Sequence, residues 1–111
     1  MAFDDVRSLY VSGPMSGLPG LNFPAFHAAA ARLRAAGYEV VNPAELNPDP
    51  CATWADCMRA DIKALMDCDG IALLPGWERS KGATLETQIA WALSMPVLVE
   101  VRWLEMAGVG A

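Results

Sequence analysis

Short apolar runs alternate with longer amphipathic segments along the chain, which is the pattern of alternating strands and helices. Ser8–Ser12 is apolar and β-prone and runs into Gly13-Pro14, so it predicts a first strand that ends at the glycine. Residues 23–36 carry apolar side chains at helical spacing, with Asn22 as the expected N-cap and Gly37 as the expected left-handed stop. A helix is therefore predicted between the first two strands.

The alternation continues through the middle of the chain. Tyr38–Val41 is predicted as a second strand, followed by a proline-rich loop over 42–53. Thr53 with Asp56 three residues later resembles a capping box, which predicts that a helix begins there and ends near Cys68.

The last part of the chain continues the alternation with a strand, a helix and a final strand. Ile71–Leu74 is a continuous apolar run, typical of a parallel strand covered on both faces. A helix is expected after the loop 76–82, and Val97–Val101 is predicted as the final strand. This order predicts an α/β fold, in which helices cover both faces of a small parallel sheet of four to five strands in three layers.

The ends of the strands locate the expected ligand site. Ligands of such sheets bind at the carboxyl ends of the strands. The turns Gly13–Ser16, Asn42-Pro43 and Pro75–Trp77 follow the first three strands, so they are predicted to converge on one crevice.

Composition limits the function classes. The chain has 111 residues, which predicts a single domain over 1–111. A net charge of -5 with scattered cations argues against a nucleic-acid polymer as the partner. Because 54% of the residues are apolar and four are Trp, we expect a homodimer or higher homo-oligomer.

The sequence predicts a cytoplasmic protein without a membrane partner. No stretch approaches the length of a membrane-spanning helix, and the first residues lack the basic start of a signal peptide. Cys51, Cys57 and Cys68 are odd in number and lack the CxxC spacing, so we expect reduced thiols. The single histidine, His27, lies far from them in sequence, so no metal site is expected. The sequence also shows no sign of a bound cofactor.

Two carboxylates stand where the apolar pattern does not favour them. Asp61 lies on or beside the apolar stripe of its helix, where it either pairs at the rim with Arg59 or Lys63 or points into the crevice. Glu86 is expected in the first turn of the next helix, at the border of its buried side, where it either complements the helix dipole or serves as an ionised nucleophile. Two carboxylates at one pocket are the minimum set for chemistry at a glycosidic carbon.

Trp77 is a candidate for stacking on a nucleobase, because it follows the third strand at the crevice. The alternative for Trp77 is packing on its own loop or in a subunit interface. Trp54, Trp91 and Trp103 are expected to be core or interface residues. Backbone N–H groups of the turn Gly13–Gly17 are available to a ligand, but the turn lacks the glycine patterns of dinucleotide or P-loop sites.

Three motifs in order resemble the nucleoside 2-deoxyribosyltransferase-like superfamily, and in particular a short branch common in phages and prophages. They are Tyr10–Ser16, Asp61 eight residues before Asp69, and Gly82–Glu86 with Ala90 four residues further on. The similarity extends from about Tyr10 to Val99. It implies a flavodoxin- or Rossmann-like fold, a dimer, and cleavage of the N-glycosidic bond of a deoxynucleoside or its 5′-monophosphate.

The resemblance also implies residue roles. Glu86 would attack C1′ and form a glycosyl-enzyme, Tyr10 would orient Glu86, and Asp61 would position the sugar or protonate the departing base. Where transferases of the superfamily commonly carry an aspartate six residues before the nucleophile, this chain has Ser80, as nucleotide-hydrolysing relatives also do. That departure favours hydrolysis over transfer.

The first glycine turn lacks the arginine that such hydrolases often use to hold phosphate; Ser16, Ser80, Arg79 and Lys81 are candidate substitutes. The candidate substrate-binding residues are Gly13, Pro14, Met15, Ser16, Trp77, Ser80 and Gly82.

The leading hypothesis is a nucleoside or nucleotide N-glycosidase or deoxyribosyltransferase of the retaining type. The alternatives are a non-catalytic nucleotide-binding or sensing module on the same fold and a dimeric structural protein. The base, the sugar, the need for a 5′-phosphate and the acceptor are not determined by the sequence.

Overall fold

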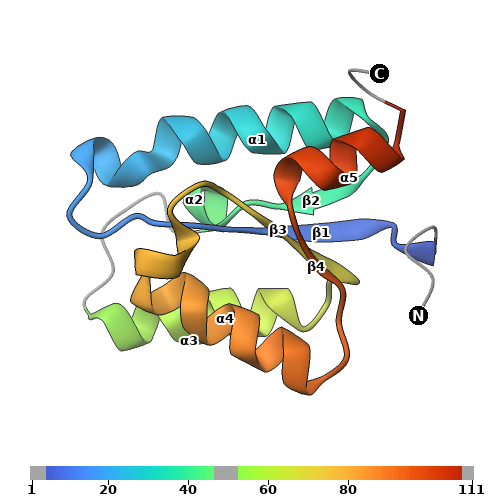
Figure 1. Cartoon of the computed structure of the whole chain (residues 1–111). Coiled ribbons are helices and arrows are strands. Elements are labelled where there is room, and N and C mark those ends of the chain that lie inside the picture. Colours follow the sequence, from blue (N-terminus) through green and yellow to red (C-terminus); the bar gives the residue numbers. More distant parts are fainter. Residues whose placement is uncertain (1–4, 47–52, 109–111) are drawn as a thin grey trace.

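A computed structural model describes residues 5–46 and 53–108 of the chain. Four strands, β1 (Ser8–Ser12), β2 (Glu39–Val41), β3 (Gly70–Leu73) and β4 (Val97–Val99), form an all-parallel sheet in the order β2-β1-β3-β4. The predicted α/β class and parallel sheet are confirmed, with four strands. β1 lies in the middle of the sheet, so its carboxyl end is flanked by loops from both sides (Figure 1).

Helices cover both faces of the sheet, which gives the three-layer arrangement predicted from the alternation. α1 (Phe23–Ala35) and α5 (Glu100–Met106) lie on one face, whereas α3 (Trp54–Leu65) and α4 (Lys81–Ala92) lie on the other (Figure 1). Short helices complete the fold: α2 (Pro43–Leu46) follows β2, and the 3₁₀ turns η2 (Pro19–Asn22) and η3 (Trp77–Arg79) precede α1 and α4. The architecture is Rossmann-like.

The alternation of side chains along β1 divides the core into two clusters. Leu9 and Val11 point toward α1 and α5, where they pack with Phe26 and Trp103. Tyr10 points the other way, into a cluster with Leu65 that lies under α3 and α4. Because side chains of a strand alternate between its faces, Ser12 shares the face of Tyr10. This face carries the candidate site.

The predicted last strand is too long. Val97–Val101 was expected to be one strand, but β4 ends at Val99 and α5 begins at Glu100. The physical reason is tertiary: the Glu100 carboxylate binds Arg32 on α1, and Trp103 Nε1 donates to the Ile71 carbonyl at 2.8 Å. These contacts stabilise a helix where local alternation favours a strand.

Helix ends agree with the sequence at some positions and differ at others. Gly37 has a φ of +105°, as expected of a left-handed stop, and Thr53 accepts a hydrogen bond from the Asp56 N–H. Asn22 does not cap α1; it is itself left-handed, with φ of 60°, and donates to the Pro14 carbonyl. The sequence placed Glu86 in a first helical turn, but α4 begins at Lys81, so Glu86 lies in the second turn.

Two further expectations concern the membrane and the thiols. No helix of the described residues is long and apolar enough to cross a membrane. Cys57 is disulfide-bonded, which corrects the expectation of reduced thiols, while Cys68 is a free buried thiol. Cys51 and the centre of the proline-rich loop lie outside the described residues.

Candidate active site

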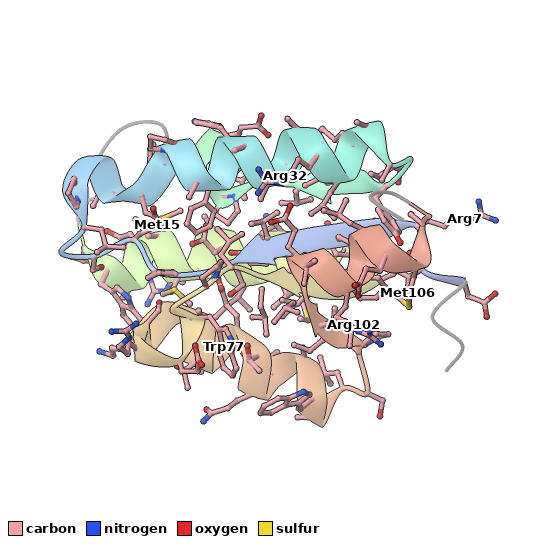
Figure 2. All side chains as sticks on the ribbon, turned by 45° about the horizontal axis from the view of Figure 1, so that its top comes forward. Arg7, Met15, Arg32, Trp77, Arg102 and Met106 are labelled. Carbon is pink, nitrogen blue, oxygen red and sulfur yellow. The ribbon has the colours of Figure 1, made fainter. Side chains whose placement is uncertain are left out.

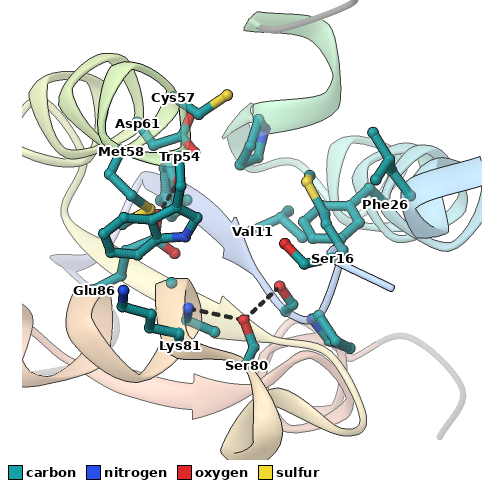
Figure 3. Close-up of a pocket in the computed structure, with 18 of the residues that line it drawn as sticks. Val11, Ser16, Phe26, Trp54, Cys57, Met58, Asp61, Ser80, Lys81 and Glu86 are labelled. Atoms are coloured by element: carbon teal, nitrogen blue, oxygen red, sulfur yellow. Dashed lines mark hydrogen bonds between the residues drawn. The ribbon is translucent and has the colours of Figure 1, made fainter. Parts of the chain in front are cut away.

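A pocket of about 610 Å³ opens at the carboxyl end of β1, between α3, α4 and the turn that follows β1 (Figure 3). Its position agrees with the general rule for parallel α/β sheets. The residues that line it are Tyr10, Val11, Gly13, Pro14, Met15, Ser16, Leu21, Phe26, Pro43, Thr53, Trp54, Cys57, Met58, Asp61, Arg79, Ser80, Lys81, Gly82, Ala83 and Glu86. The pocket therefore holds both predicted carboxylates and the predicted tyrosine.

Glu86 is a buried carboxylate held by two hydroxyls. It extends from α4 toward β1 and is only 5% exposed. The Tyr10 hydroxyl donates to Oε2 at 2.6 Å, and the Ser12 hydroxyl donates to Oε1 at 2.7 Å. Within the described residues, none of the ion pairs involves Glu86. The carboxylate is thus fixed in orientation by neutral donors.

Burial raises the pKa of Glu86 to about 7. The hydrogen bonds from Tyr10 and Ser12 act in the opposite direction, and the nearby charge of Asp61 raises the pKa further. The pKa of Tyr10 lies well above its ordinary value, first because of burial and then because of the charge of Glu86. Near neutral pH Tyr10 is therefore a neutral donor, and Glu86 is close to its midpoint of ionisation.

Asp61 is the second carboxylate of the pocket. It lies on α3, is 7% exposed and lines the cavity (Figure 3). The sequence left open whether Asp61 turns aside to the rim or points into the crevice; the structure places it in the crevice. Asp61 and Glu86 come from adjacent helices, α3 and α4, and share one cavity.

Two glycines allow the walls of the pocket to approach closely. A Cβ on Gly13 would lie 2.8 Å from Cβ of Leu74, so a larger residue there would displace the turn after β1. A Cβ on Gly82 would lie 3.1 Å from the sulfur of Met58, which packs from α3 onto the start of α4. Both glycines line the pocket, together with Pro14, Met15 and Ser16.

Ser80 joins the two loops at the pocket. Its hydroxyl accepts from the Ala83 N–H at 3.1 Å, capping α4, and donates to the Gly13 carbonyl at 3.5 Å (Figure 3). The cations Arg79 and Lys81 on either side of it are exposed and also line the pocket. The mouth of the pocket at α4 is therefore positively charged, whereas its interior holds carboxylates.

The structure places Trp77 outside the pocket lining. Trp77 begins η3 and packs against the buried cluster around Tyr10 and Leu65 (Figure 2). The aromatic residue that lines the pocket is Trp54, at the start of α3, and the Lys81 ammonium lies 4.1 Å from the centre of its ring. Sequence reasoning assigned Trp54 to the core or an interface. Its position immediately after a helix cap, seven residues before Asp61, was the available signal.

Ser12 was also missed by the sequence analysis, although the signal was present. Tyr10 and Ser12 are two residues apart in a predicted strand, and this spacing places them on the same face. Because Tyr10 was predicted to orient Glu86, the polar side chain of Ser12 on the same face was also within reach of Glu86. Within the described residues, no group of three or more His, Cys, Asp or Glu side chains is arranged to hold a metal ion.

Comparison with known proteins identifies the family of the chain. Residues 7–99 match the model of a domain of unknown function, DUF4406. The matched segment includes all four strands of the sheet and every residue of the pocket. No curated protein matches the sequence.

Proposed function

We propose that this chain, which belongs to the DUF4406 family, cleaves the N-glycosidic bond of a nucleoside or its 5′-monophosphate, with Glu86 as the nucleophile. The observation that carries the proposal is the environment of Glu86: a buried carboxylate at a pocket, with both oxygens on hydroxyl donors and a second carboxylate, Asp61, in the same cavity. The resemblance to the nucleoside 2-deoxyribosyltransferase-like superfamily supports the same assignment.

The environment of Glu86 suits a nucleophile. A carboxylate paired with a cation is neutralised and attacks poorly, whereas hydroxyl donors orient the group and leave its negative charge in place. Burial removes the water that would otherwise solvate the carboxylate. A pKa near 7 leaves a large fraction ionised at neutral pH while increasing basicity.

The proposed reaction has two steps. In the first, an oxygen of Glu86 forms a bond to C1′ while the bond from C1′ to the base nitrogen breaks, and the departing base takes a proton from Asp61. In the second, water attacks C1′, the ester to Glu86 breaks, and Asp61 takes up the proton from water. Both steps invert C1′, so the overall result is retention. A second base in place of water would give transfer.

The shape and lining of the pocket fit this substrate class. A volume of about 610 Å³ is in the range of small-molecule sites. Trp54, Met58 and Phe26 supply apolar surface for a base, and Trp54 can stack on it. Arg79 and Lys81 at the mouth are suited to a 5′-phosphate. Homodimerisation and a cytoplasmic location remain predictions from the sequence.

The test incubates the protein with a panel of ribo- and deoxyribonucleosides and their 5′-monophosphates. Chromatography measures the free base that is released. Glu86→Gln is the blank, because it keeps the shape of the side chain and removes its charge. Glu100→Gln is the matched control, since Glu100 is a buried glutamate outside the pocket. We expect base release by the parent and by Glu100→Gln and none by Glu86→Gln.

Equal release by the parent and Glu86→Gln would contradict the mechanism. Silence of the folded parent across the whole panel would contradict the enzyme assignment. In that case a rise in melting temperature with a nucleotide would favour the binding module, and no rise would favour the structural protein.

A further inference from the structure

Ser12 is a buried polar residue whose hydroxyl is directed at the proposed nucleophile. It is 1% exposed at the end of β1, in register with Leu73 of β3. Its hydroxyl donates to Oε1 of Glu86 at 2.7 Å, while Tyr10 from the same face of the strand donates to Oε2. The central strand thus holds both oxygens of the carboxylate at once.

We propose that Ser12 is a positioning residue for the reaction proposed above: its hydroxyl keeps the Glu86 carboxylate charged and fixed in one orientation at the pocket. The effect of Ser12 on turnover rests on the proposed function. The hold on Glu86 itself is a property of the protein without substrate. Ser12 does not line the pocket, so it acts through Glu86 and not on the substrate.

The charges around Glu86 explain why a second donor is needed. Asp61 faces the Glu86 carboxylate from α3, and Tyr10 presents its neutral hydroxyl to the same carboxylate from β1. Burial and the charge of Asp61 both disfavour the ionised form of Glu86, and among the described residues the hydrogen bonds from Tyr10 and Ser12 are what favours it. Without Ser12, one donor would have to oppose both effects, so the pKa of Glu86 would rise above 7.

Packing alone does not explain a serine at this position. Alanine would fill a small buried position at the end of a central strand equally well, and its side chain needs no hydrogen-bond partner. The Ser12 hydroxyl has a partner, and that partner is the carboxylate. Tyr10 cannot replace it, because Tyr10 already occupies the other oxygen.

The chain offers a matched control for removal of a buried hydroxyl. Thr87 is the neighbour of Glu86 on α4 and is fully buried, and its hydroxyl has no hydrogen-bond partner in the part of the chain that the structure describes. Thr87→Val removes that hydroxyl at constant shape and does not touch the carboxylate. Ser12→Ala removes the hydroxyl that binds Glu86, and Ser12→Thr retains one.

The first readout is the pH dependence of kcat/KM for base release. For Ser12→Ala we expect the acidic limb to move up by about one pH unit, so that activity at pH 6 falls roughly tenfold while activity well above the pKa recovers. Ser12→Thr is expected to restore the limb toward that of the parent, and Thr87→Val to leave it in place. A purely structural role would lower activity equally at all pH values.

The second readout needs no substrate. The ionisation of Glu86 is followed by carbon NMR of its carboxyl in the parent, Ser12→Ala and Thr87→Val. An upward shift of the Glu86 midpoint in Ser12→Ala alone supports the inference, even if the parent releases no base and the proposed function fails. An unchanged midpoint in folded Ser12→Ala, or the same shift in Thr87→Val, would overturn it.

Discussion

Two buried glutamates lie on opposite faces of the sheet, and they are stabilised differently. Glu100, at the start of α5, accepts from the guanidinium of Arg32 on α1 through both oxygens, at 2.7 and 2.9 Å. Glu86, on α4, accepts from the hydroxyls of Tyr10 and Ser12, with no cation among its partners in residues 5–46 and 53–108, and shares its pocket with Asp61.

The difference separates a glutamate that holds the fold from one that is available for chemistry. The Arg32 pair links two helices and neutralises the charge of Glu100, which is the usual arrangement for a buried carboxylate. Glu86 has no such cation in the described residues, so its ionisation costs free energy of folding. A group that weakens the fold in this way is a candidate for a functional residue.

The largest expected effect separates the two glutamates by activity. Glu86→Gln should lower the rate of base release by at least roughly a thousandfold, because it removes the nucleophile and keeps the fold. Glu100→Gln should retain most of the activity. The comparison is made by steady-state rates with circular dichroism of both variants as the check of folding. Similar rates for the two variants would remove the distinction.

The second effect is on stability as a function of pH. The folded pKa of Glu86 is about 7 against an ordinary value of 4.5, so the folded state binds the proton more tightly than the unfolded state does. The free energy of unfolding should therefore fall as pH rises from about 4.5 to about 7. The difference between these two pKa values, at about 1.4 kcal/mol for each pKa unit, corresponds to a loss of roughly 3 to 4 kcal/mol from this group.

Glu86→Gln isolates this contribution, because other carboxylates titrate in both proteins. The difference in free energy of unfolding between variant and parent, from urea unfolding at several pH values, should grow between pH 4.5 and 7 and then remain constant. A difference that does not change with pH would mean that Glu86 is as easily ionised in the folded chain as in the unfolded one.

The third effect distinguishes a tryptophan that lines the pocket from one that packs in the core on the same face of the sheet. Trp54 lines the cavity, whereas Trp77 packs against the buried cluster around Tyr10. Trp54→Ala should raise KM by roughly five- to a hundredfold through lost stacking on the base, with little change in melting temperature. Trp77→Ala should mainly lower the melting temperature and have a smaller effect on KM. The opposite pattern would place the base elsewhere.

The smallest effect concerns the cation-paired glutamate. Glu100→Gln should lower the free energy of unfolding by roughly 1 kcal/mol, because Arg32 is half exposed and water solvates it when its partner is lost. Unlike the effect of Glu86→Gln, this one is destabilising near pH 7. Urea unfolding at pH 7 checks the sign, and stabilisation by Glu100→Gln would contradict the structural role of the pair.

Much of the fold could be predicted from the sequence, because its elements are encoded locally. The first strand was predicted with its observed bounds, and Gly37 and Thr53 mark helix ends through their own backbone or side chain. Asp61 and Glu86 were identified as carboxylates on apolar stripes, and both are buried at one pocket. A polar side chain that breaks an apolar pattern is visible without the structure.

The features that could not be predicted depend on contacts between distant segments. The start of α5 at Glu100 depends on Arg32, which is 68 residues away in the sequence. The assignment of Trp54 to the pocket, and of Trp77 to the packed cluster, depends on how α3 and α4 are placed against each other. Periodicity predicts which side of a helix is buried, but not which buried residue borders a cavity.

The most direct test of the central claim is a search for the covalent intermediate on Glu86. The enzyme is mixed with a nucleoside or nucleotide that it cleaves, quenched in acid within one turnover and analysed by mass spectrometry of the intact chain and its peptides. The account predicts an added glycosyl group on the peptide that contains Glu86, absent from Glu86→Gln. Base release with the group attached to a different residue would contradict it.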